Sequence, residues 1–244
     1  MNPRPGLLFA VGLLAAGCAP LATRPVPSRY LDRLGSMPDF YQADRAYGPL
    51  PRGGRAYCGP TAAANALVWL DTHGFADLLP AAAPGPQDQL ELIRTLGAAK
   101  YMHTHPVRGT GPAGIMRGIR HYCSTRGYAV TTEYAGWRTE SCRVAPQPAV
   151  PWMLRSTMGA SSLILNVGWY AADADKAVDY TRTGGHYVTV AGYERRDDGI
   201  FLHIHDPAKR SQRGRRDSIV RCPVRCRLTP LPKGRVLRKK KDGG

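Results

Sequence analysis

The chain has 244 residues, of which 43% are hydrophobic, enough for a normal globular core, and this composition excludes a wholly disordered chain. Its length suggests one domain with short extensions. Lys and Arg number 34 against 18 Asp and Glu, which gives a formal net charge of +16. Such a surface attracts polyanions, but the arginines are scattered, so no specific nucleic-acid site is predicted. An arginine-rich composition without any polyanion partner is the alternative.

An export signal opens the chain. Residues 1–17 combine Arg4 with the apolar run LLFAVGLLAA, which is too short to span a membrane but typical of a signal peptide. The segment LLAAGCAP resembles the lipobox of bacterial lipoproteins. That resemblance implies lipidation of Cys18, and Ala19 after it favours the outer membrane of the cell envelope. Cleavage by ordinary signal peptidase is the alternative, because Ala15 stands where the lipobox more often has Leu.

Three regions follow the signal. Residues 18–38 are rich in Pro, Arg and small residues and are expected to form a tether. Residues 39–231 are expected to form the folded body. The basic, Gly-ended tail, 232–244, is expected to be disordered.

The first half of the body is predicted to be helical. The segment CGPTAAANALVWLDTHG has Pro60 in its first turn and Gly74 as its stop. The segments PQDQLELIRTLGAAKY and GPAGIMRGIRHYCSTRGY repeat apolar residues at helical spacing.

The second half is predicted to form strands. The segments YAVTTEY and SSLILNVGWY have the composition of strands, with a short helix expected in PAVPWMLRSTMG between them. The clearest hairpin is GGHYVTVAGYERRDDGIFLHIHDP, with Asp198 and Gly199 as a favoured turn pair. Helices first and an antiparallel sheet second indicate an α+β fold.

Three residues carry the candidate chemistry. Cys58 begins a predicted helix, where free backbone N–H groups and the positive end of the helix dipole stabilise a thiolate. His186 opens a strand after two glycines, at the open end of an apolar face. Asp206 ends the returning strand of the hairpin, close to His186, where a carboxylate could orient the imidazole. A buried structural thiol, a core histidine and a turn aspartate are the alternatives.

These motifs carry a family resemblance. YCGPTAAANAL, GGHYVTVAGY and HDP resemble the double-glycine-peptidase-like group of papain-fold cysteine peptidases, over about residues 40–207. The resemblance implies a papain-like fold with Cys58 as nucleophile, His186 as base and Asp206 as the orienting residue. It also implies an oxyanion-hole glutamine shortly before the cysteine. Gln42 is the only Gln before Cys58, although its gap to the cysteine is long. No metal or organic cofactor is required.

Export also determines how the other cysteines are interpreted. Of six cysteines, four remain if Cys18 is lipidated and Cys58 is catalytic, and an even remainder in an oxidising compartment suggests two disulfides. The disulfide candidates are Cys123, Cys142, Cys222 and Cys226. Pairing by closeness in sequence joins 123 to 142 and 222 to 226, but all three connectivities stay open. A zinc site is the weaker alternative, since CPVRC has no second closely spaced pair.

The sequence therefore predicts a cysteine peptidase that hydrolyses a peptide or protein substrate on the bacterial envelope. Two alternatives stay open. The same site serves cell-wall peptide hydrolases, amidases and acyl transferases, and the body could instead be a non-catalytic binding lipoprotein. The pairs His103/His105 and His203/His205 are interpreted as surface histidines, because zinc needs three or four convergent ligands.

Overall fold

The computed structural model describes residues 25–46, 48–79, 85–136, 143–172, 180–208 and 219–230. The predicted signal peptide, Cys18, Cys142 and the basic tail lie outside these residues. Within them, no helix is both long enough and apolar enough to cross a membrane.

The described residues contain four α-helices: α1 (Cys58–Asp71), α2 (Pro86–Gly97), α3 (Pro112–Thr125) and α4 (Val150–Ser156). All four were predicted. Helices α1, α2 and α3 each end a few residues earlier than the segment in which they were expected. A proline stands in the opening turn of α2, α3 and α4. Proline is tolerated there because the N–H it lacks would have no intrahelical acceptor.

The strands of the described residues form one sheet. They are β1 (Arg29–Tyr30), β2 (Tyr128–Ala135), β3 (Arg143–Ala145), β4 (Ser161–Ala172), β5 (Tyr180–Arg196), β6 (Gly199–His205) and β7 (Ile219–Pro230). The order is β1-β5-β4-β7-β2-β3, and β6 pairs with β5 outside this path. All pairs are antiparallel except β2 with β3, which is parallel. The predicted α+β class is therefore confirmed.

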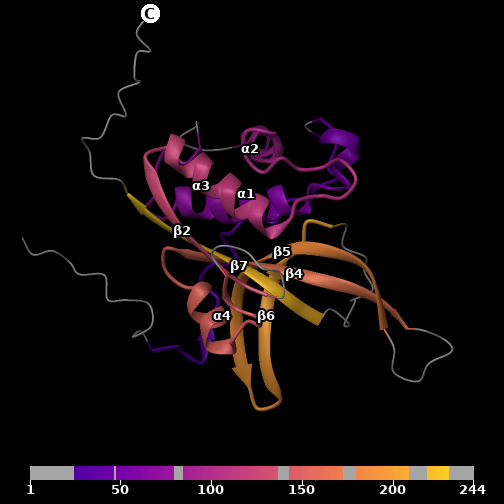
Figure 1. Ribbon diagram of the computed structural model, residues 1–244. Helices are drawn as coiled ribbons and strands as arrows, with labels where there is room; N and C mark the ends of the chain where they lie inside the picture. Colours follow the sequence, from indigo (N-terminus) through magenta and orange to yellow (C-terminus); the bar gives the residue numbers. More distant parts are fainter. Residues whose placement is uncertain are drawn as a thin grey trace, which may run out of the picture.

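Helices α1, α2 and α3 lie on one face of the sheet, and α4 lies on the other (Figure 1). Because successive side chains of a strand point to opposite faces of the sheet, the hydrophobic core is divided into two clusters, one on each face. Ile164 and Tyr187 belong to the larger cluster under α1 to α3. Leu163, Leu165 and Val188 belong to a second cluster, which packs against Trp152 and Met153 of α4 (residues 150–156). The site described below lies where α1 meets the sheet.

Helix α1 is almost entirely buried, and it lies close to β5. Ala62, Ala63 and Ala64 are fully buried, and their small side chains let the helix approach its neighbours. The Thr189 hydroxyl of β5 donates a 2.7 Å hydrogen bond to the Ala62 carbonyl oxygen. This contact sets the distance between the start of α1 and the strand that carries His186.

Strand β7 was not predicted, and it changes the interpretation of two cysteines. It lies between β4 and β2, with Cys222 opposite Asn166 and Cys226 opposite Ser162. Four residues of a strand span roughly 13 Å, whereas disulfide formation requires Cα atoms within about 7 Å. A disulfide between Cys222 and Cys226 is therefore excluded by the backbone of β7.

Cys123 is a free thiol on α3, fully buried in the larger core. Cys142 lies outside the described residues, so a disulfide between Cys123 and Cys142 stays a prediction.

Part of the expected tether belongs to the folded body, so the boundary predicted at residue 39 is too late. Strand β1 pairs with the end of β5. Arg33 is fully buried, and it donates to Ser162 Oγ at 3.3 Å and to the Gly159 carbonyl oxygen at 2.5 Å. Its guanidinium carbon lies 4.0 Å from the centre of the Trp69 ring. An Arg-rich composition suggests solvated chain, but an aromatic face and two acceptors allow this arginine to be buried.

Replacing Arg33 by Ala is expected to lower the free energy of unfolding by about 2–4 kcal/mol. The change leaves a cavity beside Trp69 and removes the donors to two buried acceptors. Urea denaturation measures the effect, with the exposed Arg29→Ala as the matched control, expected within about 0.5 kcal/mol of the parent. A loss for Arg33→Ala no larger than that of the control would show that this segment is not part of the cooperative unit.

Candidate active site

The structure brings His186 and Asp206 together across the β5–β6 pair. His186 lies on β5, and Asp206 follows the last residue of β6. The register places His205 opposite Thr189, so Asp206 comes to lie level with the residues between His186 and Thr189. The distance between His186 Nε2 and Asp206 Oδ1 is 2.5 Å. The same carboxylate oxygen accepts the backbone N–H of Ala208 at 2.8 Å.

Cys58 completes a row of three side chains. It is the first residue of α1 and is half-buried. It lies close enough to His186 for the thiol to raise the pKa of the imidazole. Because Nε2 of the imidazole is turned to Asp206, Nδ1 is the ring nitrogen left for the thiol. The imidazole thus lies between the candidate nucleophile and the carboxylate, the arrangement expected of a nucleophile, a base and an orienting residue.

The charges at this site favour a protonated histidine. Burial alone would lower the pKa of His186, but the hydrogen bonds and charges of Asp206 and Cys58 outweigh it and raise that pKa to about 9. Burial acts in the opposite direction on Asp206, yet the hydrogen bonds from His186 and Ala208 hold the pKa of this carboxyl below its ordinary value. At neutral pH, His186 is therefore an imidazolium facing a carboxylate.

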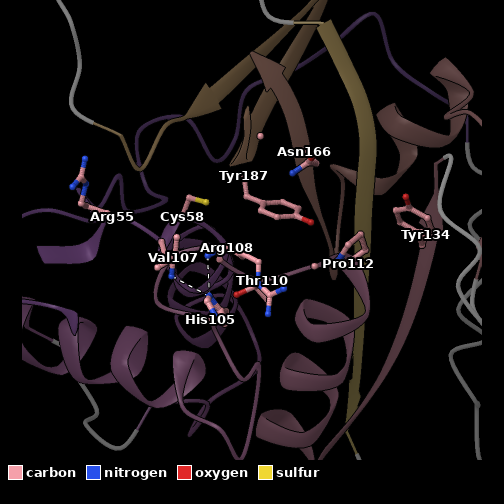
Figure 2. A pocket seen from close by; sticks show the side chains of 14 residues that line it. Arg55, Cys58, His105, Val107, Arg108, Thr110, Pro112, Tyr134, Asn166 and Tyr187 are labelled. Atoms are coloured by element: carbon pink, nitrogen blue, oxygen red, sulfur yellow. Dashed lines mark hydrogen bonds between the residues drawn. The ribbon is translucent and has the colours of Figure 1, made fainter. Parts of the chain in front are cut away.

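A cleft of about 470 Å³ adjoins Cys58 (Figure 2). One of its walls is the segment 105–112, which connects α2 to α3, and the sheet contributes Asn166 and Tyr187. Figure 2 shows Arg55 on one side of Cys58, with Tyr187 and Asn166 on the other. The cleft is open beside the candidate nucleophile, as a substrate would require.

Sequence reasoning missed most of the cleft. Tyr187 directly follows His186 in a predicted strand, and it belongs to the larger core cluster under α1 to α3. Asn166 lies opposite Tyr187 on β4, and that pairing cannot be predicted from local sequence. The wall at 105–112 has no strong pattern, since its place depends on how α2 and α3 pack.

Gln42 is not among the described residues that line the cleft. Its side-chain Nε2 donates to the carbonyl oxygens of Gly54, at 2.9 Å, and Arg55, at 3.4 Å. Its backbone N–H donates to the Pro207 carbonyl oxygen at 2.9 Å. Gln42 therefore connects the turn before the candidate nucleophile with the residue after the candidate orienting carboxylate.

The turn itself requires a glycine at position 54. Gly54 has a φ of +78°, and a Cβ built on it would lie 1.7 Å from the Gln42 carbonyl oxygen. Only glycine fits both the backbone conformation and the close approach. This tight turn lets Gln42 lie against the residues that lead into α1.

The remaining histidines do not form a metal centre. His203 Nε2 lies 2.7 Å from Glu194 Oε1, and His205 Nδ1 lies 2.9 Å from the Pro38 carbonyl oxygen. Within the described residues, no group of three or more His, Cys, Asp or Glu side chains could hold a metal ion.

No protein-family model matches the chain, and neither do the curated proteins and the solved structures that were compared with it. Function is therefore inferred from the geometry of the site. A half-buried thiol at a helix start and next to an open cleft, followed by a protonated histidine and a carboxylate, constitutes the parts needed for nucleophilic catalysis.

Replacing Gln42 by Ala is expected to lower the free energy of unfolding by about 1–3 kcal/mol, because one buried and one partly buried carbonyl oxygen lose their donor. Chemical denaturation measures this, and the exposed Gln147→Ala is the matched control. The oxyanion role implied by the family resemblance predicts the reverse. It requires unchanged stability and a fall in kcat of about 10²–10³, and that pattern would contradict the structural role.

Proposed function

We propose that this chain is a papain-like cysteine peptidase, which hydrolyses peptide bonds through an acyl-enzyme. The observation that carries the proposal is the position of the His186 imidazole between Cys58 and Asp206, with a pKa raised to about 9. An imidazolium next to a thiol at a helix N-terminus favours the thiolate, which is the nucleophilic form of cysteine.

In the proposed reaction, the Cys58 thiolate attacks the carbonyl carbon of the scissile bond and forms a C–S bond. The His186 imidazolium gives its proton to the departing amine nitrogen as the C–N bond breaks. Water then attacks the thioester, and the neutral His186 accepts its proton. Release of the acid restores the thiolate and the imidazolium. Asp206 holds the ring in one orientation throughout and transfers no proton.

The oxyanion of the tetrahedral intermediate needs hydrogen-bond donors. The backbone N–H of Cys58 is one proposed donor, because a residue in the first turn of a helix has no intrahelical acceptor for its N–H. Gln42 is not needed in this scheme, since its amide already binds two carbonyl oxygens.

The proposal includes a location. The signal-like start of the chain and the lipobox-like sequence around Cys18 favour an exported enzyme, held on the outer membrane by lipid. A peptide or protein in the cell envelope would then be the substrate. No organic cofactor enters the proposed reaction.

Iodoacetamide at neutral pH is expected to alkylate Cys58 much faster than a model thiol, with peptide hydrolysis lost in parallel. Cys123 should stay unlabelled in native protein, because it is fully buried and burial raises its pKa to about 12. Peptide mapping by mass spectrometry measures both rates. The control variant Cys58→Ala should lose hydrolysis and keep its circular dichroism spectrum. If Cys58 reacts no faster than the model thiol, the proposal fails.

Activity is expected to fall on the alkaline side with an apparent pKa near 9, as His186 loses the proton that it must donate. Protonation of His186 also contributes to the free energy of folding, and this contribution has the same pH dependence. It is complete below the ordinary histidine pKa of about 6.5 and is lost as the pH rises through 9.

The variant Asp206→Ala should move this alkaline limb to lower pH, since it removes one of the two partners that raise the pKa of His186. Activity should fall less than in His186→Ala, because only His186 transfers a proton. A pH profile of kcat/KM for each variant measures this. An unmoved limb in Asp206→Ala would contradict the assigned roles.

A further inference from the structure

The cleft beside Cys58 has an uneven distribution of charge. Figure 2 draws 14 residues that line it, and none of these described residues is Asp or Glu, whereas two are arginines, Arg55 and Arg108. The carboxylate nearest to this chemistry, Asp206, does not line the cleft and is already hydrogen-bonded to His186. A negatively charged group entering the cleft therefore meets no described acidic side chain there.

The two arginines approach the cleft from different elements. Arg55 is exposed, in the turn that leads into α1. Arg108 is exposed, in the wall segment between α2 and α3. Both side chains line the same cavity as Cys58. A ligand in this cleft can thus meet either guanidinium group, and both residues are exposed to solvent in the free protein.

The loop that carries Arg108 is held in shape by its own hydrogen bonds. His105 and Gly109 exchange two backbone hydrogen bonds, of 3.0 and 2.9 Å. The Nδ1 atom of His105 accepts the backbone N–H groups of Val107, at 3.1 Å, and Arg108, at 3.0 Å (dashed in Figure 2). The backbone of Arg108 is therefore fixed before any ligand arrives, which lowers the entropy lost on binding.

This loop also packs against the turn of the nucleophile. A Cβ built on Gly109 would lie 3.4 Å from the Ala56 carbonyl oxygen, and one built on Gly59 would lie 3.4 Å from Thr110 Cβ. All four residues in these two contacts lie within two sequence positions of Cys58 or of Arg108. The backbone position of Arg108 relative to Cys58 is thus held by this packing.

We propose that this cleft selects peptides that carry a carboxylate close to the scissile bond, and that Arg55 and Arg108 bind that carboxylate. The inference rests on the proposed peptidase function and specifies its substrate class. A guanidinium forms paired hydrogen bonds with a carboxylate, so it recognises the shape of the group as well as its charge. The formal net charge of +16 further raises the local concentration of anionic peptides. Acidic protein segments and carboxylate-bearing wall peptides share this chemistry.

Alkylation of Cys58 by two reagents of similar shape tests the charge without any substrate. Iodoacetate is anionic and iodoacetamide is neutral, so the ratio of their rates at Cys58 reports the potential in the cleft. The variants Arg55→Gln and Arg108→Gln should each lower this ratio by about two- to fivefold at low salt. Arg195→Gln, an exposed position at the far end of β5 from His186, makes the same charge change and should leave the ratio unaltered.

The outcomes of this test separate the two proposals. If neither cleft variant changes the ratio, or if Arg195→Gln changes it equally, the carboxylate-binding role is overturned. If Cys58 reacts slowly with both reagents but the ratio still depends on Arg55 and Arg108, the peptidase proposal fails, while the cationic cleft is supported.

Matched peptides then test the substrate class. Quenched fluorescent peptides with Glu near the scissile bond should be hydrolysed with a higher kcat/KM than their Gln counterparts, and Arg108→Gln should reduce that preference. Equal rates for Glu and Gln peptides in the parent enzyme would overturn the inference. Isolated peptidoglycan forms the second arm. Release of wall fragments would identify the wall as the source of the carboxylate, and cleavage of the Glu peptides alone would identify an acidic protein.

Discussion

The contact between α1 and β5 is the interaction on which the candidate site depends. The hydroxyl of Thr189 binds the carbonyl oxygen of Ala62 in a fully buried setting, where a hydrogen bond is electrostatically strong. Cys58 lies one helical turn before Ala62, and His186 lies a few residues before Thr189 on the same strand. This bond therefore helps to hold the candidate nucleophile against the candidate base, through regular backbone on both sides.

A second set of hydrogen bonds, made by Gln42, reaches the chain beside Asp206, the third candidate residue. Gln42 binds the turn before Cys58 with its side chain and the residue after Asp206 with its backbone N–H. Chemistry of this kind depends on angles and distances that the reacting groups cannot maintain by themselves. Here the supporting contacts come from a segment that carries none of the three catalytic candidates.

Local patterns predicted the helices and the β5–β6 hairpin because their signals lie within the segments themselves, such as Pro60 in the first turn of α1 and Asp198 in the hairpin turn. The positions of Cys58, His186 and Asp206 follow from those elements. Strand β7 pairs with residues far away in sequence, so its place between β4 and β2 has no local signal. Arg33 was misassigned because its burial depends on Trp69, which composition cannot reveal.

The packing of the N-terminal segment has a mechanical consequence. Tension arriving along the chain ahead of residue 25 would first load the pairing of β1 with the end of β5, and next the side chain of Arg33. β1 meets β5 at the opposite end from His186, whereas Arg33 contacts Ser162 of β4, the Gly159 carbonyl oxygen and the ring of Trp69 near the end of α1. Such a force would be shared between the hydrogen-bonded sheet and the last turns of α1, at the opposite end of that helix from Cys58.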